Sequence, residues 1–321
     1  MKVKGALATG FIIALILIVG ISYAAPCVDD FSLENPFWNG HSQLKLKTHP
    51  TELLDYMELP VGFSARDTTL LIIGPSKPFN EGEVECIRRF LEDGGLVVLA
   101  DDFGSGNDLL MKLKVKAKFS ALPLRDPLFK YKGSYLPKTI DFKPSPYTVN
   151  LSSIALNHAT ILENLGGEVE VLAYSTIFSY LGAKKSVGPF PVMAEVKLGS
   201  GSLVLISDSS IFINSMLNKE NNSQFLANLV RGKSVVIDTI HWEASNLIAF
   251  KGMLTQIYLV AGRIEVRYIL VALLLVAVFK LNFKRGEKRG DWLKEVLRKH
   301  PEWDAKLLRE LEEERGIYGA G

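Results

Sequence analysis

The chain has 321 residues, a formal net charge of +2 and only two cysteines, Cys27 and Cys86. This charge balance gives no electrostatic case for nucleic-acid binding, which uses clustered positive charge. Two cysteines cannot form a disulfide framework. The mean hydropathy of +0.17 is high for a globular chain, and the excess lies in two apolar runs.

The first apolar run, Gly5–Tyr23, has about the length that a bilayer crossing needs. Lys2 and Lys4 precede it, which places the N-terminus in the cytoplasm. The alternative is a cleaved signal peptide, because Ser22-Tyr23-Ala24 has the pattern of a cleavage site. The run is longer than the apolar part of a usual signal peptide, which favours a retained transmembrane anchor over residues 1–23.

Residues 69–107 are predicted to form a strand–helix–strand unit. Thr69–Ile73 and Leu96–Ala100 are short, continuous apolar runs, as strands buried on both faces require. Between them lies an amphipathic helix for which Asn80 is the expected N-cap. A crossover of this length joins two parallel strands with right-handed connectivity.

Further strands and helices are expected in the second half of the chain. Val192–Leu198 and Ser202–Ser207 are predicted to form a hairpin through Gly199-Ser200-Gly201. An amphipathic helix, Asn222–Val230, precedes a last strand at Ser234–Ile237. The remaining expected elements are a short strand at Leu44–Lys47, a short helix at Glu52–Leu59 and a strand at Glu168–Tyr174.

The second apolar run covers residues 264–283 and is followed at once by Lys284, Arg285, Lys288 and Arg289. That positive cluster marks the cytoplasmic side of a second transmembrane helix. We therefore expect a two-pass protein of the cell membrane with both termini in the cytoplasm and residues 24–263 outside. Residues 284–321 would be a cytoplasmic tail of two short amphipathic helices, which cover a membrane, a partner protein or each other.

Several stretches of the chain resemble domain-of-unknown-function family 4350. They are Asn35–Ser42, Gly74-Pro75, Phe90–Gly95, Ala100–Gly104, Gly201–Ile211, Asn222–Leu229, and Val236–Asp238 with His241 nearby. The resemblance implies a doubly wound, flavodoxin-like α/β sheet of the class I glutamine-amidotransferase type, flanked by two transmembrane helices. It also implies that the membrane and other membrane or cytoplasmic proteins, an AAA-type ATPase system among them, are the partners.

An amidotransferase needs a cysteine on a tight turn between a strand and a helix, within reach of a histidine–carboxylate pair. Cys86 is predicted in the middle of a helix, and Cys27 adjoins the first apolar run. Neither cysteine follows a strand. The sequence therefore predicts no catalytic residue, and it indicates no cofactor and no metal ligand.

Acidic side chains instead occur where predicted strands end. The candidate ligand crevice consists of Asp101, Asp102, Asp208, Ser209, Asp238 and His241. Parallel neighbouring strands would bring these residues to one edge of the sheet, where α/β proteins bind their ligands. Such a crevice would suit a divalent cation, a basic peptide segment or a hydroxyl-rich ligand. The alternative is that these residues cap the turns and helices that follow, as Asp and Ser commonly do.

These patterns together indicate a non-catalytic binding or scaffold protein that works in a larger membrane assembly. The alternative from another class is a metal-assisted hydrolase that uses Asp101, Asp208, Asp238 and His241 at the ends of the strands.

Overall fold

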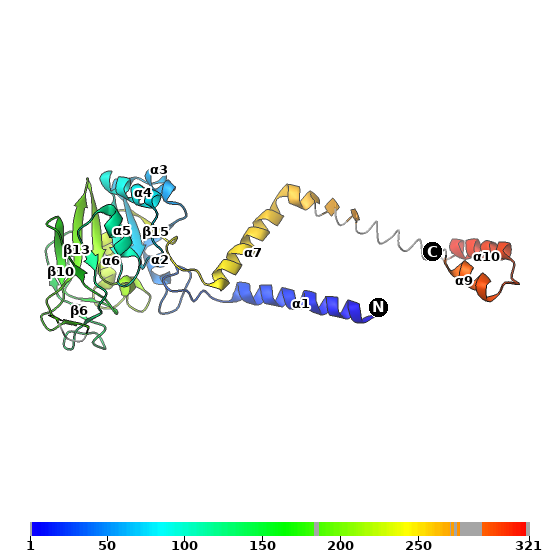
Figure 1. The fold of residues 1–321 in the computed structure, drawn as a ribbon, viewed down its shortest axis with the longest axis horizontal. Coiled ribbons are helices and arrows are strands. Elements are labelled where there is room, and N and C mark those ends of the chain that lie inside the picture. The colour runs from blue at the N-terminus through cyan, green and yellow to red at the C-terminus, as the bar shows by residue number, and fades with distance from the viewer. Residues whose placement is uncertain (1, 183–185, 270, 273–274, 277–290, 319–321) are drawn as a thin grey trace. The chain divides into compact units, whose positions relative to one another are not determined.

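The computed structural model describes residues 2–182, 186–269, 271–272, 275–276 and 291–318. The chain divides into two compact units, Met1–Ala249 and Phe250–Gly321. The first unit contains a mixed α/β fold (Figure 1). In the second unit the described elements are helices: most of α7 (Asn246–Gly262), α9 (Asp291–Lys299) and α10 (Ala305–Tyr318).

An eight-stranded sheet in the order β1-β15-β2-β3-β14-β13-β10-β7 forms the centre of the first unit. Its strands are β1 (Thr51–Leu53), β2 (Thr68–Ile73), β3 (Leu96–Ala100), β7 (Asp141–Phe142), β10 (Val169–Tyr174), β13 (Pro191–Leu198), β14 (Gly201–Ile206) and β15 (Ser234–Asp238). The pairs from β1 to β14 are parallel. The pairs that continue through β13, β10 and β7 are antiparallel.

The unit also contains helices and short strands outside the large sheet. The helices are α1 (Lys2–Ala24), α2 (Ser42–Thr48), α3 (Leu59–Gly62), α4 (Glu81–Glu92), α5 (Gly106–Leu113) and α6 (Asn222–Val230), with 3-10 turns η1 (Tyr56–Glu58), η2 (Ala65–Asp67) and η3 (Ser209–Phe212). The short strands are β4 (Lys118–Phe119), β5 (Leu124–Arg125), β6 (Lys138–Thr139), β8 (Ile154–Ala155), β9 (Leu162–Glu163), β11 (Tyr180–Leu181) and β12 (Ser186–Val187). They pair as β12-β11-β5, β4-β9 and β6-β8.

The predicted strand–helix–strand unit is confirmed as β2, α4 and β3. The two strands are parallel neighbours, with Ile73 opposite Ala100 at their carboxyl ends. Asn80 caps α4 by accepting a bond from the Glu83 amide at 3.0 Å, and the Glu83 carboxylate accepts the Asn80 amide at 2.7 Å. This reciprocal capping box satisfies two amides that the first turn leaves unpaired.

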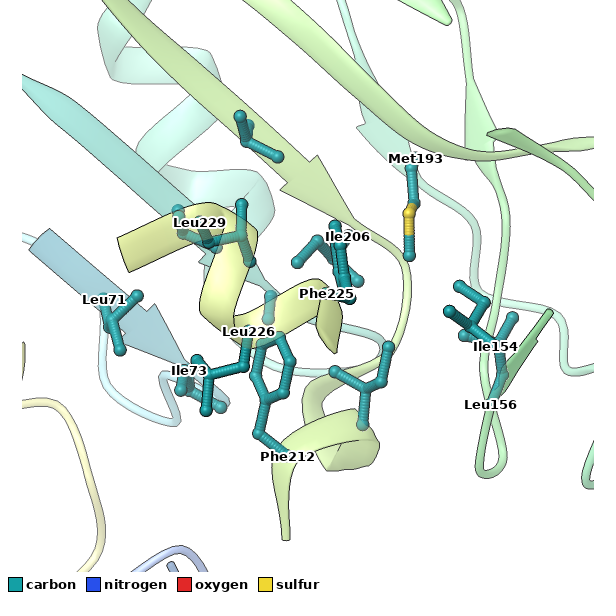
Figure 2. Close-up of a cluster of buried hydrophobic side chains, with 14 of the residues drawn as sticks. Leu71, Ile73, Ile154, Leu156, Met193, Ile206, Phe212, Phe225, Leu226 and Leu229 are labelled. Atoms are coloured by element: carbon teal, nitrogen blue, oxygen red, sulfur yellow. The ribbon is translucent and has the colours of Figure 1, made fainter. Parts of the chain in front are cut away.

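The sheet has an apolar core on each face because successive side chains of a strand point to opposite faces. On β2, Leu70 and Ile72 pack with side chains of α4 and α5. Leu71 and Ile73 pack with α6 and η3 on the other face, where Figure 2 shows Ile73 near Leu226 and Phe212. Both faces of the central strands are therefore buried, as their continuous apolar sequences predicted.

The large sheet is mixed, with parallel strands at its centre and antiparallel strands at one edge. The expected doubly wound, flavodoxin-like sheet of the amidotransferase type, flanked by two transmembrane helices, is not supported beyond this mixed α/β architecture. The hairpin of β13 and β14 was predicted and is present, with Gly199 at a φ of +62° in its turn. That reversal turns β13 antiparallel to its neighbour, and β10 and β7 then extend the sheet in the same manner.

Two short elements were also predicted wrongly. Residues 44–47 belong to helix α2, although Leu44 and Leu46 alternate with lysines as in a strand. Only Leu44 is buried, and Leu46 is 72% exposed, so the alternation did not mark a buried face. Glu52 and Leu53 lie in strand β1, which pairs with β15, and the helical part of the following segment is limited to short turns.

The two expected transmembrane helices are not supported, and with them the assignment to the cell membrane with both termini inside is wrong. Among the residues that the structure describes, no helix is both long and apolar enough to cross a membrane. The first predicted span lies in α1, which has 23 residues. Helix α7 has 17 residues and ends at Gly262, and the described residues 264–269, 271–272 and 275–276 of the second predicted span are also helical. Residues 270, 273–274 and 277–283 of that span lie outside the described residues.

Gly201 at the start of β14 lies against backbone that cannot move aside. A Cβ added there would meet the carbonyl oxygens of Leu91 and Gly95, each at 2.4 Å. We expect Gly201→Ala to lower the free energy of unfolding by about 1–3 kcal/mol, because the start of the strand must shift away from α4. Urea unfolding measures this loss, and Gly133→Ala, where a Cβ meets nothing within 4 Å, serves as the control with little expected change. Equal stability of both variants would contradict the close approach.

Candidate functional site

The acidic residues singled out from the sequence lie at the carboxyl edge of the parallel strands. Asp238 ends β15, Asp101 follows β3, and Asp208 follows β14 by one residue. The strands β15, β2, β3 and β14 are consecutive neighbours in the sheet. Asp101, Asp208 and Asp238 therefore lie at the same edge of the sheet, as the order of the parallel strands predicted. Their hydrogen bonds show whether they are free to bind a ligand.

Asp101 caps the loop and helix that follow β3. Its two carboxylate oxygens accept the amides of Gly104 at 3.0 Å and Gly106 at 2.7 Å. The side chain is 1% exposed, and this burial raises the pKa of Asp101 from 3.8 to about 6, against the lowering effect of the two amides. Both oxygens are occupied by the backbone, so the side chain serves the start of α5.

Asp102, Asp208 and Ser209 form the next group along the edge. Asp102 Oδ2 accepts a bond from the Ser209 hydroxyl at 3.0 Å. Asp208 is completely buried, and its two oxygens accept the amides of Asn157 and Ser210 at 2.7 and 2.8 Å. Burial, followed by the charge of Asp102, raises the pKa of Asp208 well above its usual value. Asp208 thus caps η3 and ties it to a distant loop.

Asp238 and His241 form a separate buried group with residues of α4 and η1. His241 Nδ1 lies 2.8 Å from Asp238 Oδ2, and Nε2 lies 3.3 Å from Glu83 Oε2. The imidazole stacks on Phe79 with 3.8 Å between ring centroids. Burial and the charge of Asp238 raise the pKa of Tyr56, whose ring stands edge-on to the imidazole. Within the described residues, no hydrogen bond or ion pair joins this group to Asp101 or Asp208.

The chemistry of these groups fits capping better than catalysis. In the part of the chain that the structure describes, no three His, Cys, Asp or Glu side chains come together in a way that could hold a metal ion. Cys86 is buried in mid-helix in α4, and burial raises the pKa of its thiol, which keeps it protonated. The described edge therefore presents neither an activated nucleophile nor a set of metal ligands.

The hollow part of this edge lies beside the predicted residues rather than among them. Two adjoining hollows of about 350 and 230 Å³ share Asp29, Asp30, Trp242, Glu243 and Ala244 in their walls. We call them together the acidic cleft. Gly74 and Ser76, which follow β2, and Phe31 complete the first hollow, and Glu34 and Glu52 contribute to the second.

The two walls of the acidic cleft are fixed to each other and to the sheet. Trp242 donates its indole N–H to the Ile73 carbonyl at 2.6 Å, at the carboxyl end of β2. The Asp29 carboxylate accepts the Ser245 amide at 2.6 Å across the cleft. The His241 carbonyl accepts the amide and hydroxyl of Ser76 at 2.9 and 2.8 Å. These hydrogen bonds hold the residues that line the cleft in place within the first unit.

The acidic cleft is strongly negative. Five carboxylates line it, and in the described chain only Glu34 forms an ion pair, with Lys45. Phe31 and Trp242 add aromatic faces. Behind them lies His41, fully buried, with its pKa lowered to about 3 by burial, so the imidazole stays neutral and offsets none of the negative charge. Unneutralised carboxylates beside an aromatic face suit a cationic group.

None of the six residues predicted for the crevice lines the acidic cleft, although Trp242 directly follows His241. Sequence reasoning missed Asp29 and Asp30 because they lie in an irregular segment far from the predicted strand ends. Their pairing with residues 242–245 depends on the long-range contact between Asp29 and Ser245. The one usable signal was the position of Trp242-Glu243 shortly after Asp238 and β15.

A family model described as "Domain of unknown function (DUF4350)" matches residues 60–230 of the chain. The search of curated proteins found no match to the chain. The match covers β2, α4, β3 and the β13–β14 hairpin.

Several solved structures are similar to the chain at low identity. The mmIFT52 N-terminal domain is 17% identical with a TM-score of 0.43, over 56% of this chain and 81% of that one. The cytoplasmic protein STM1381 from Salmonella typhimurium LT2 is 10% identical with a TM-score of 0.38, over 57% and 78%. A β-galactosidase from Bacillus circulans sp. alkalophilus is 16% identical with a TM-score of 0.32, over 50% of this chain and 22% of that enzyme. These scores are too low to define the fold or the function.

Proposed function

Because the chain belongs to the DUF4350 family, for which the family description gives no activity, we propose from the site itself that it is a non-catalytic binding or scaffold protein. Its ligand is a basic segment of another protein, held in the acidic cleft. The observation that carries this proposal is the set of five cleft carboxylates with a single internal ion pair.

The cleft chemistry favours lysine or arginine side chains over other ligands. An ammonium or guanidinium group can pair with Asp30 or Glu243 and lie on the Trp242 ring. A small metal ion would need three or more ligands in close geometry, and no such group occurs among the described residues. The alternative of a metal-assisted hydrolase draws no support from Asp101, Asp208 or Asp238, whose oxygens accept bonds from neighbouring residues.

The proposal can be tested with short peptides of defined charge. We expect a fluorescent tetralysine peptide to bind the full chain and tetraglutamate not to bind. The double variant Asp30→Asn/Glu243→Gln is expected to weaken tetralysine binding about tenfold, because two unpaired charges in a confined site contribute roughly 1.4 kcal/mol. Fluorescence anisotropy measures both affinities at one salt concentration. The AAA-type ATPase system expected from the family is the first protein partner to test.

A matched control separates the cleft from the overall charge of the protein. Glu170→Gln removes one exposed carboxylate on β10, away from the cleft, and its affinity for tetralysine should equal that of the unmodified chain. Equal loss in the control and the cleft variant would assign binding to net charge alone and overturn the proposed site.

A further inference from the structure

A second surface of the first unit combines exposed apolar side chains with positive charge. It is formed by residues 121–134, 175–182 and 186–187, which come together through the pairing of β5 with β11. The exposed apolar residues are Leu122, Leu128, Ile177, Phe178 and Val187, and their exposed fractions run from 44% to 64%. We call this surface the cationic apolar face.

The two segments are locked together by a buried carboxylate. Asp126 is 0% exposed, and its Oδ1 accepts the amides of Leu128 and Phe129 at 2.8 and 2.7 Å. Its Oδ2 accepts a bond from the hydroxyl of Thr176 on the other segment. Beyond this link, the rings of Phe129 and Phe178 stack with 5.9 Å between centroids. Leu128, Phe129, Ile177 and Phe178 are therefore held in place at the surface.

The charge on the cationic apolar face has one sign. Asp126 is the single acidic residue in 121–134, and residues 175–182 and 186–187 contain none. Arg125, Lys130 and Lys132 lie on the first segment, and none of them forms an ion pair with a residue that the structure describes. The guanidinium of Arg125 lies 4.1 Å from the centre of the Tyr135 ring. With its one carboxylate buried, the surface lacks counter-charge of its own.

We propose that the cationic apolar face docks an acidic segment of a partner protein that carries apolar anchor residues. Exposed apolar side chains bordered by polar residues mark protein interfaces, and the unpaired cations select carboxylates by charge complementarity. Exposed apolar side chains with lysine and arginine would also bind an anionic lipid surface, but such binding does not need the side chains to be fixed in position. The fixed geometry that Asp126 imposes favours a partner of defined shape, because preorganised side chains bind with less entropy loss.

This docking surface is separate from the acidic cleft, since the two share no lining residue and attract opposite charges. A chain with both surfaces can hold a basic segment and an acidic segment at the same time. The inference does not rest on the proposed function of the cleft, and each surface can fail its own test while the other passes.

A displayed library of random dodecamer peptides, selected on the full chain, tests the proposal. We expect enriched sequences that combine Asp or Glu with Leu, Ile, Phe or Trp. A synthetic peptide of the enriched sequence should bind about tenfold more weakly to Leu128→Ser/Ile177→Ser, which removes two anchors. Lys130→Glu and added sodium chloride should also weaken binding, because the attraction is electrostatic and screened by salt.

Met111→Ser is the matched control, since Met111 is 68% exposed on α5 and lies outside the face. Its peptide affinity should be unchanged, and circular dichroism should show the same folded structure for all variants. Enriched peptides without carboxylates, or equal binding to the double variant, would overturn the proposal. It would also be overturned if the double variant lost binding to phosphatidylserine vesicles while no peptide was enriched. Self-association of the chain that the double variant abolishes, with no peptide enriched, would likewise overturn it.

Discussion

Replacing Phe225 with alanine is expected to lower the free energy of unfolding by about 3–5 kcal/mol. Phe225 is fully buried on α6 and stacks on Phe212 of η3, with 5.9 Å between ring centroids. Figure 2 shows the ring between the helix and Ile206 of β14. The lost ring leaves a cavity that neighbours on two elements cannot close, since η3 is fixed by the Asp208 cap. Urea unfolding followed by tryptophan fluorescence measures the effect.

The control for this prediction is Phe103→Ala. Phe103 is 53% exposed, and its amide donates to the Asp102 carboxylate oxygen Oδ1, a bond that alanine retains. We expect a change below about 0.5 kcal/mol, as for most exposed substitutions. If Phe225→Ala cost no more than this control, α6 would not be part of the core of the first unit.

The second large effect concerns pH. The folded protein is expected to lose about 3 kcal/mol of stability through Asp101 as the pH rises from about 4 to about 6. Burial raises the pKa of Asp101 from 3.8 to about 6 in the folded state, and each pKa unit corresponds to about 1.4 kcal/mol. Over this interval the folded state binds the proton more tightly than the unfolded state, so stability falls as pH rises and then levels off above the folded pKa.

The variant Asp101→Asn does not titrate and should show a stability–pH curve flatter by about 3 kcal/mol over the same interval. Burial also raises the pKa values of Asp102 and Asp208, with the same sign, so a slope from these two residues remains in the variant. Urea unfolding at a series of pH values measures both curves. Phe103→Ala, which changes no titratable group, should leave the shape of the curve unchanged. Parallel curves for the Asp101 variant and the unmodified chain would contradict the burial argument.

The centre of the fold could be predicted from sequence because local signals and tertiary packing agree there. Asn80 and Glu83 form a capping box that the sequence displays directly. The continuous apolar run of β2 requires burial on both faces, and the two cores on either side supply it. The turn between β13 and β14 was also predictable, because Gly199 adopts a left-handed backbone conformation there that glycine favours.

The rest of the fold lacked such signals. Strands β4 to β9 are two residues long, too short for any periodicity to show. Strand β7 joins the large sheet through Asp141 and Phe142 opposite Tyr174 and Ala173, a pairing that depends on the tertiary fold. The predicted apolar spans rested on hydropathy and on flanking positive charge, and neither signal fixes where a helix begins and ends. The described residues 264–269, 271–272 and 275–276 of the second run are helical, but no helix among the described residues is long and apolar enough to cross a membrane.

The candidate site was predicted in part for a physical reason. The position of Asp101, Asp208 and Asp238 at one sheet edge follows from the order of the parallel strands, which the sequence can suggest. Whether those oxygens are open or already occupied depends on loops such as residues 104–106 and 157, whose paths no local pattern defines. The acidic cleft joins Asp29 to Ser245, and only the folded chain brings them together.

The place of β15 in the sheet has a consequence for how the chain folds during synthesis. This last strand of the large sheet lies between two of the earliest, β1 and β2, and pairs Thr51 with Val236. At a translation rate of about 5–20 residues per second, β15 is therefore synthesised on the order of ten seconds after β2. During that time one edge of β2, with Leu70 to Ile73, has unpaired backbone groups that can join a strand of another chain. Pairing over such a sequence distance also makes folding slow, so expression at low temperature with chaperones should raise the folded yield.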